Sequence, residues 1–163
     1  MKNKKALSQV VSTVLLIALA IALIAGIWGT IQSFVEERLE KTESCYGIFE
    51  KIKINGEYTC YNSSDNILQI SISRGEIEID SLLVGISMET SSKTFTLTNQ
   101  NITIEGVTNY PNNSTGVKLP SKEGGKTYYV YGIDSFPKKI ELAPKINQNQ
   151  CDVADSTSQI NYC

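Results

Sequence analysis

The 163-residue chain contains no histidine. Histidine is the usual general base near neutral pH, the common partner of a serine or cysteine nucleophile, and the most frequent ligand of transition metals. The sequence also lacks a Walker loop, a nucleophile elbow and a paired-glycine dinucleotide motif. We therefore expect no enzyme, no catalytic residues, no cofactor and no metal ion.

Positive charge is scarce after the first few residues. The chain has 15 basic and 17 acidic residues, a net charge of −2, and Lys2, Lys4 and Lys5 carry three of the positive charges. Without those three the remainder sums to −5, and an acidic body does not attract a phosphodiester backbone. We expect no nucleic-acid partner. With 41% hydrophobic and 20% charged residues, the composition instead indicates one ordinary domain with an appendage.

No residue from Ala6 to Val35 carries a charge. A bilayer's hydrocarbon layer needs only about 20 helical residues, so this stretch is longer than a span requires. The lysines before it and Glu36 and Glu37 after it predict an N-terminus inside the cell and an exterior C-terminal part. A secretory signal that is wholly removed is disfavoured, because the apolar run is too long and its A-x-A triplets lie within it.

Small residues recur along this predicted helix. Ala18, Ala22 and Gly26 form one row at four-residue spacing, and Ala25, Gly29 and Ser33 form a second. Rows of small residues let neighbouring helix backbones approach closely, although alanine and glycine are also common in ordinary membrane spans. We interpret the rows as helix-packing surfaces.

The opening of the chain resembles the start of archaeal type IV pilin-like proteins, the class that includes adhesion pilins and archaellins, over about 35 of its 163 residues. The resemblance rests on the basic leader and on the run from Lys4 to Ala18, KKALSQVVSTVLLIA. In that family a membrane prepilin peptidase removes the leader, and an assembly platform adds the retained apolar helix to a filament core. The resemblance implies a leader at residues 1–6, processing at Lys5, Ala6 and Leu7, and a mature chain that starts at Leu7. Val11 stands where bacterial pilins usually carry glutamate, which fits an archaeal member.

After Ser44 the helical periodicity gives way to alternation of apolar and polar residues. Short strands are predicted at residues 48–54, 58–61, 68–73, 76–80, 82–88, 94–98, 101–105, 126–133 and 138–142. Asn55-Gly56 predicts a two-residue hairpin turn. We expect an α+β chain with a long hydrophobic helix at residues 7–44 and an exterior antiparallel β-sandwich head at residues 45–163.

Four cysteines lie beyond the span, and an even number in an oxidising compartment predicts two disulfides. We favour the sequence-local pairs Cys45–Cys60 and Cys151–Cys163. A bridge from Cys45 or Cys60 to the C-terminal tail is the alternative. Metal ligation is disfavoured because the chain has no Cys-x-x-Cys spacing and no histidine.

N-glycosylation sequons occur at Asn62, Asn101, Asn112 and Asn113. An exterior domain is where such acceptors can be modified, so we expect a glycoprotein. Asn112 and Asn113 lie in a polar segment, residues 109–126, that we expect to be an exposed loop. Asn101 is instead expected to be half hidden in a strand.

Two further groups of residues have both a chemical and a structural interpretation. Glu76, Glu78 and Asp80 are spaced as catalytic carboxylates can be, but the solvent face of a strand produces the same i, i+2 spacing, and we favour that reading. Tyr128, Tyr129 and Tyr131 suit a sugar or a base, yet adjacent strand tyrosines more often divide between core and surface.

The function expected from these observations is that of a structural subunit of an archaeal type IV pilus-like filament, with a role in adhesion. Its partners would be copies of itself, the prepilin peptidase, the assembly platform and the membrane. It would lie in the cell membrane before assembly and in an extracellular surface filament afterwards. The alternative is a non-assembling, singly anchored surface binding protein that keeps its lysine leader.

Overall fold

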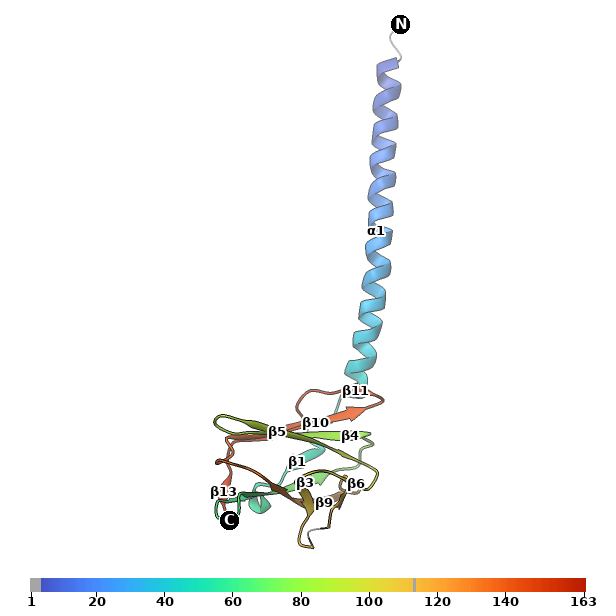
Figure 1. Cartoon of the computed structure of the whole chain (residues 1–163). Helices are drawn as coiled ribbons and strands as arrows, with labels where there is room; N and C mark the ends of the chain where they lie inside the picture. Colours follow the sequence, from blue (N-terminus) through green and yellow to red (C-terminus); the bar gives the residue numbers. More distant parts are fainter. Residues whose placement is uncertain (1–3, 113) are drawn as a thin grey trace. The chain divides into compact units, whose positions relative to one another are not determined.

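A computed structural model describes the backbone of residues 4–112 and 114–163, and the side chains of residues 11–35, 45–112 and 114–163. The chain divides into two compact units, Met1–Thr42 and Glu43–Cys163. One N-terminal apolar helix precedes a mostly antiparallel sheet domain, which confirms the α+β layout (Figure 1). The second unit is called the head below.

Helix α1 spans Lys4–Ser44, and its end agrees with the predicted boundary. Its apolar stretch contains no proline, so every backbone group can bond within the helix, as a hydrocarbon environment requires. The stretch Val11–Val35 is long and apolar enough to cross a membrane.

The head contains two larger sheets and a two-stranded one. The first sheet has the order β13-β2-β3-β9-β7, and β1 also pairs with β3; the second has the order β11-β10-β4-β5, and β12 pairs with β10. All of these pairs are antiparallel except β13 with β2. The first sheet comprises β1 (Ile52–Ile54), β2 (Cys60–Asn62), β3 (Ile67–Arg74), β7 (Val107–Asn109), β9 (Gly124–Tyr131) and β13 (Asn161–Tyr162). The second comprises β4 (Ser81–Ser87), β5 (Ser92–Thr98), β10 (Lys139–Ile146), β11 (Asn149–Gln150) and β12 (Asp155–Thr157), while β6 (Ile102–Thr103) pairs with β8 (Gly116–Val117).

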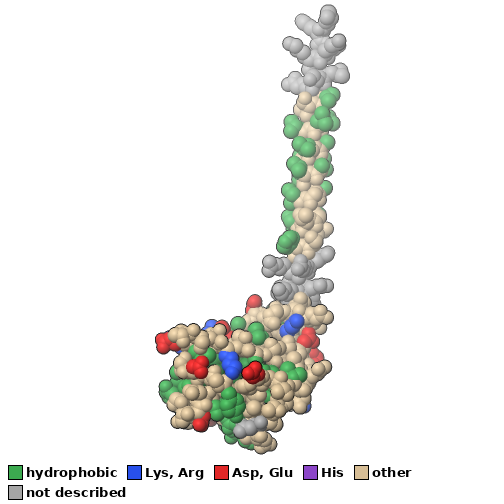
Figure 2. Space-filling view, in the orientation of Figure 1, with side chains coloured by type: hydrophobic (Ala, Val, Ile, Leu, Met, Phe, Trp, Pro, Cys, Tyr) green, Lys and Arg blue, Asp and Glu red, His purple; other side chains and the backbone are tan. Residues whose placement is uncertain are grey.

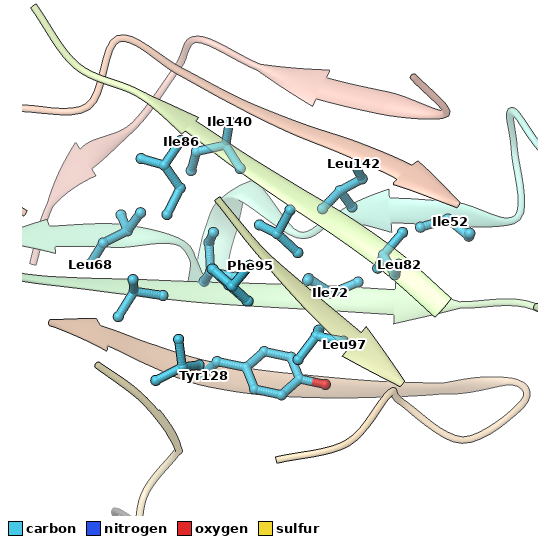
Figure 3. Packing of buried hydrophobic residues seen from close by; sticks show 14 of the residues in the cluster. Ile52, Leu68, Ile72, Leu82, Ile86, Phe95, Leu97, Tyr128, Ile140 and Leu142 are labelled. Carbon is cyan, nitrogen blue, oxygen red and sulfur yellow. The ribbon is translucent and has the colours of Figure 1, made fainter. Parts of the chain in front are cut away.

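The inward faces of the two larger sheets share one hydrophobic core (Figure 3). Alternation places every second residue of a strand on the same face, and the buried residues follow that rule. From the first sheet come Leu68, Ile70, Ile72, Tyr128 and Val130, and from the second Leu82, Val84, Ile86, Phe95, Leu97, Ile140 and Leu142. Burying each large apolar side chain contributes about 1.5–3 kcal/mol, so this core dominates the stability of the head.

A basic side chain bridges the two sheets at each end of the core. Arg74 is the last residue of β3, only 5% exposed, and it donates hydrogen bonds to Asn99 Oδ1 at 3.3 Å and to the carbonyl oxygen of Pro120 at 3.2 Å. Lys93 on β5 donates to the carbonyl oxygen of Tyr131 on β9. Because each cation meets backbone or amide oxygens, the ends of the core are closed without an unpaired buried charge.

The predicted hairpin at Asn55-Gly56 is wrong. Strands β1 and β2 run in the same direction along one edge of β3, since both are antiparallel to it. A short 3₁₀ helix, η1 (Gly56–Tyr58), joins them, and Asn55 caps it by accepting from the Glu57 N–H at 3.2 Å. The buried Thr59 hydroxyl then donates to the Asn55 carbonyl at 2.8 Å, which fixes the step between the strands.

Three other local predictions also need correction. Residues 76–80 form no strand, although Ile79 is buried as the alternation predicted. Strand β10 continues through Pro144, whose carbonyl accepts from the Cys151 N–H at 2.9 Å, because proline lacks only a donor. The segment 109–126, expected to be an exposed loop, buries Val117 and Leu119 in the core.

Candidate functional site

The apolar helix is the first candidate, because the apolar side chains of its described stretch are exposed. None of the residues from Val11 to Val35 is buried, and the large ones are 48% to 66% exposed. Figure 2 shows hydrophobic side chains along the described part of the helix and no charged ones. Monomeric soluble proteins rarely expose contiguous apolar surface of this extent. The helix therefore requires lipid or protein around it.

The predicted packing residues of α1 lie on this exposed surface. Ala18, Ala22, Ala25, Gly26 and Gly29 all have exposed side-chain positions. A Cβ atom added at Gly26 or Gly29 would meet nothing within 4 Å, so no contact among the described residues explains either glycine. The space beside these two glycines is open among the described residues, as a helix-packing surface requires.

Polar side chains near the end of the span find acceptors within the helix. The Thr30 hydroxyl donates to the Ile27 carbonyl at 2.8 Å, and the Ser33 hydroxyl donates to the Thr30 carbonyl at 3.0 Å. Such bonds satisfy a hydroxyl where water is absent. The two groups are thus compatible with an apolar environment.

The predicted processing residues Lys5, Ala6 and Leu7 lie in the first turns of α1, where the structure describes the backbone only. Their side chains lie outside the described residues, and Met1 to Asn3 lie outside them entirely. Processing at these positions stays a prediction.

The disulfides differ from the favoured sequence-local pairing. Cys45 bonds to Cys151, with Cα atoms 5.6 Å apart, and Cys60 bonds to Cys163, with Cα atoms 5.0 Å apart. Both N-terminal cysteines of the head are therefore joined to the C-terminal tail, which was the alternative. Each bridge closes a loop of more than 100 residues, and two disulfides fit an oxidising compartment.

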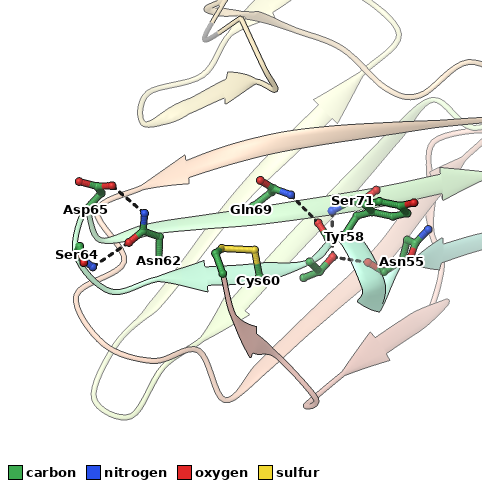
Figure 4. The surroundings of a disulfide bond; sticks show 10 residues. Asn55, Tyr58, Cys60, Asn62, Ser64, Asp65, Gln69 and Ser71 are labelled. Atoms are coloured by element: carbon green, nitrogen blue, oxygen red, sulfur yellow. Dashed lines mark hydrogen bonds between the residues drawn. A yellow bond between two sulfur atoms is a disulfide. The ribbon is translucent and has the colours of Figure 1, made fainter.

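The path of the tail explains this pairing. After β10 the chain turns back, and β11 and then β12 pair with β10. Strand β13 then lies parallel to β2 with Asn161 opposite Cys60, so Cys163 reaches the first sheet (Figure 4). The sequence does not reveal this pairing, because contact between strands about 100 residues apart leaves no local signal.

The described sequons are accessible to different degrees. Asn101 is exposed and precedes β6, so the expectation that a strand hides it is wrong. Asn112 is exposed in the turn after Pro111, whereas Asn113 lies outside the described residues. Asn62 is half-buried, and its side chain donates to Asp65 Oδ2 at 2.8 Å (Figure 4). Asn101 and Asn112 are the more accessible acceptors, and glycosylation itself stays a prediction.

The three tyrosines of β9 divide between the two faces of the first sheet, as predicted. Tyr128 points into the core, where burial raises its pKa, and its hydroxyl donates to the Lys118 carbonyl at 2.7 Å. Tyr129 and Tyr131 lie on the outer face with ring centroids 6.5 Å apart. Tyr110, 47% exposed, packs edge-to-face on Tyr129 at 5.3 Å. We call Tyr110, Tyr129 and Tyr131 the tyrosine face.

A hollow of about 500 Å³ opens where β1, β3 and β9 meet. Its lining includes two lysines and two glutamates, and the other lining residues are Ser73, Arg74, Gly75, Gly124 and Gly125. With Arg74 the lining has three basic and two acidic side chains, and Arg74 also pairs with Glu78 at 3.7 Å, so the mixed charges select neither an anion nor a cation. The hollow does not bring together the groups that a catalytic site needs.

The acidic residues at 76, 78 and 80 do not converge on a common point. Glu78 pairs with Lys122, and the hydrogen bond from that lysine holds the pKa of Glu78 below its ordinary value of 4.5. Asp80 instead accepts from the Gln148 N–H at 3.1 Å. In the described part of the chain no three His, Cys, Asp or Glu side chains are placed to hold a metal ion.

The sequence reasoning missed Arg74 altogether. Its guanidinium also donates twice to the Ile77 carbonyl, at 3.1 and 2.7 Å, and so fixes the segment between β3 and β4. An arginine at an inward position of an alternating strand was the available signal, because buried arginine is rare unless it is paired. Its role is structural, since its donors face oxygens of the protein.

An N-terminal helix able to span a membrane, together with two disulfides, fits a membrane-anchored or extracellular protein. Comparison with protein-family models, with curated proteins and with solved structures finds no match for this chain.

Proposed function

We propose that this chain is a structural subunit of an archaeal type IV pilus-like extracellular filament, in which copies of α1 pack side by side and the heads form the outer surface. The observation that carries the proposal is the exposed apolar stretch Val11–Val35. Removing a large apolar side chain from water is worth about 1.5–3 kcal/mol, so a stretch with more than ten of them must lie in a bilayer or in a helix bundle.

Two properties support the bundle over a simple anchor. The stretch is longer than one bilayer needs, and its glycines and alanines form rows that are exposed in the described part of α1. The buried core residues and both disulfides all lie within the head, so the head buries its core without side chains from α1. A permanent helix with an independent head suits a subunit that leaves the membrane and enters a filament.

The test is electron microscopy of appendages purified from the surface of the source cells, with N-terminal sequencing of the subunit. We expect this chain to be in the filaments and to begin at or within a residue of Leu7. A chain found only in the membrane with its lysine leader intact would instead establish the singly anchored binding protein.

A matched pair of variants tests the packing rows. Ala22→Leu adds bulk to a row, whereas Ala20→Leu makes the same change about 200° away around the helix. We expect Ala22→Leu to reduce filament yield at least about tenfold, an effect of about 1.4 kcal/mol, while Ala20→Leu stays near the wild-type yield. Equal yields from the two variants would contradict packing through the rows.

A further inference from the structure

Strand β5 lies at an edge of the second sheet, and only one of its two sides is paired (Figure 1). It pairs with β4 in an uninterrupted register that runs from Ser81 opposite Thr98 to Ser87 opposite Ser92. No other strand of the described residues pairs with it. A strand in this position presents a row of backbone N–H and C=O groups without ladder partners.

One hydrogen bond shows which backbone groups of β5 point to its free side. The Thr98 carbonyl accepts from the N–H of Leu119, a residue outside β4, at 2.8 Å. Successive residues of an antiparallel strand direct their backbone groups to opposite sides, so Ser92, Thr94 and Thr96 point the same way as Thr98. In the described part of the chain the backbone groups of these three residues have no partner on that side. We call them the β5 edge.

The β5 edge carries none of the usual protections against the addition of a strand. Proteins block an open edge with a proline, a bulge, a charged side chain or a covering segment. Strand β5 has seven residues without a proline, and its register with β4 contains no bulge. Its one charged side chain, Lys93, is directed inward to the Tyr131 carbonyl. The edge is therefore open to the backbone of another strand.

The other outer strands of the two larger sheets are short or covered. Strands β1, β7 and β12 have three residues each, and β11 and β13 have two. Beside β7, the Asn109 N–H donates to the Ser114 carbonyl at 3.0 Å, and β13 is followed directly by the disulfide-bonded Cys163. Among the described residues β5 thus has the longest open edge, and a partner that adds a strand to the head is expected there.

The sequence of β5 suits a second copy of itself as that partner. Antiparallel copies centred on Phe95 place Thr94 opposite Thr96 of the other copy, so that the free N–H and C=O groups of both edges face each other. Cross-strand threonine pairs are favourable. In this register Lys93 lies opposite Leu97, and no like charges meet, whereas a register centred on Lys93 would set two lysines opposite each other.

The surroundings of β5 also permit the approach of a copy. The outward residues of the neighbouring strand β4 are uncharged, namely Ser81, Leu83, Gly85 and Ser87. One strand further, Lys139 and Glu141 pair with each other at 2.6 Å. Chains anchored in one membrane or held in filaments meet copies of themselves at a high local concentration. A copy is thus both the complementary partner and the most abundant one.

We infer that the β5 edges of two copies pair antiparallel about Phe95, which joins two heads into one continuous sheet. A contact of this kind uses the same surface on both copies and closes at two. It does not build a helical filament, but it links a head in one filament to a head in a neighbouring filament. That linkage rests on the proposed function, whereas the pairing of heads does not need α1 to assemble.

The test uses the full chain in lipid nanodiscs that each hold one copy, so that the helices of different copies stay apart. Sedimentation measures whether discs associate through their heads as the concentration rises. We expect dimers of discs, and no larger species, to be half formed below about 0.1 mM chain.

Amide hydrogen exchange at single residues identifies the contact. The Thr94 and Thr96 N–H groups should exchange at least about tenfold more slowly in the dimer, because they gain hydrogen-bond partners. The Phe95 N–H points to β4 in either state and should change little. A contact made by side chains alone would not produce this alternation.

A matched pair of variants separates the backbone from the side chain. Thr94→Pro removes an N–H that has no partner in the head, so the head should stay folded while dimerisation weakens at least about tenfold. Thr94→Val keeps the N–H and the branched side chain, and it should dimerise within about threefold of the wild type. Circular dichroism and intact mass verify folding and both disulfides, and Thr96→Pro replaces Thr94→Pro if that variant unfolds.

Several results would overturn the inference. These are discs that stay monomeric up to about 0.1 mM, species larger than dimers, unchanged exchange at Thr94 and Thr96, or equal dimerisation by Thr94→Pro and the wild type. Loss of the dimer in Ala22→Leu would assign the contact to α1, and a different protein bound to β5 in chains from the source cells would exclude self-pairing. Filament yield and the N-terminal sequence do not depend on β5, so a negative result here leaves the filament proposal to its own test.

Discussion

The helix and the head use the same apolar residue types in opposite ways. Leu16 in α1 is 66% exposed, whereas Leu142 in β10 is fully buried between the sheets. The head buries a hydrophobic core within itself and adds two disulfides. In α1 the backbone groups bond within the helix, but the apolar side chains of Val11–Val35 stay exposed. The difference shows that folding alone buries the core residues of the head, whereas the apolar residues of α1 need lipid or other protein around them.

The chain also provides separate probes for the two units. All eight tyrosines lie in the head, and the one tryptophan, Trp28, lies in α1. Tyrosine near-ultraviolet circular dichroism therefore follows the head, and tryptophan fluorescence follows the helix. Each of the following changes uses the two signals to separate the units.

The largest expected effect comes from removing a disulfide. In Cys60→Ala/Cys163→Ala the Cys45–Cys151 bridge remains, so the loop that opens runs through that bridge and has about 27 residues. Opening it costs the head about 3.6 kcal/mol in the chain-entropy account. Urea unfolding in micelles should show this loss in the tyrosine signal, with the Trp28 signal unchanged. A parallel shift of both signals would mean that the two units unfold together.

A matched leucine pair sharpens the contrast in burial. Leu142→Ala should lower the free energy of unfolding of the head by about 2–5 kcal/mol, because it leaves a cavity in the core. Leu16→Ala makes the same change on the exposed helix and should leave the tyrosine transition where it is. A loss of head stability in Leu16→Ala would show that the helix supports the head.

The next effect concerns Arg74. Arg74→Lys keeps the charge, but one ammonium group cannot reach Ile77, Asn99 and Pro120 together. Each buried acceptor left unpaired costs about 1–3 kcal/mol, so the tyrosine transition should move to lower urea. Lys122→Gln is the control, because Lys122 pairs with the same Glu78 carboxylate as Arg74 but is itself exposed, and it should change little. Equal effects of the two would contradict a special role for the buried arginine.

The smallest effect is a pH dependence confined to the head. Hydrogen bonds from Lys122 and Lys138 lower the pKa values of Glu78 and Glu89 in the folded state. A lowered folded pKa adds stability above the ordinary value of 4.5, and that stability is lost as the pH falls through the folded values. The Tm of the head should therefore decline slightly below pH 4.5, and less in Glu78→Gln/Glu89→Gln. Both carboxylates are exposed, so a large decline would point to other groups.

The sequence predicted the strands that hold the core and missed how they connect. Leu68, Ile70 and Ile72 were recognisable as one buried face because alternation is a local pattern. Asn55-Gly56 wrongly predicted a hairpin, because this dipeptide is typical of two-residue hairpin turns. In the structure β1 and β2 both pair antiparallel with β3, so the two strands run in the same direction and no hairpin forms between them. The role of Arg74 and the packing of Tyr110 on Tyr129 went unrecognised, because in each case the contacting residues are far apart in the sequence.

The sequence by itself determined that an apolar helix precedes a β-rich head and that the four cysteines lie beyond the helix, because hydropathy and periodicity are properties of neighbouring residues. Only the tertiary structure decided that Cys45 and Cys60 bond to the tail, that Arg74 closes the core, and that Tyr110 packs against Tyr129 on the outer face of the first sheet. Each of these depends on strands far apart in the chain being brought side by side, and that pairing follows from the burial of the whole core.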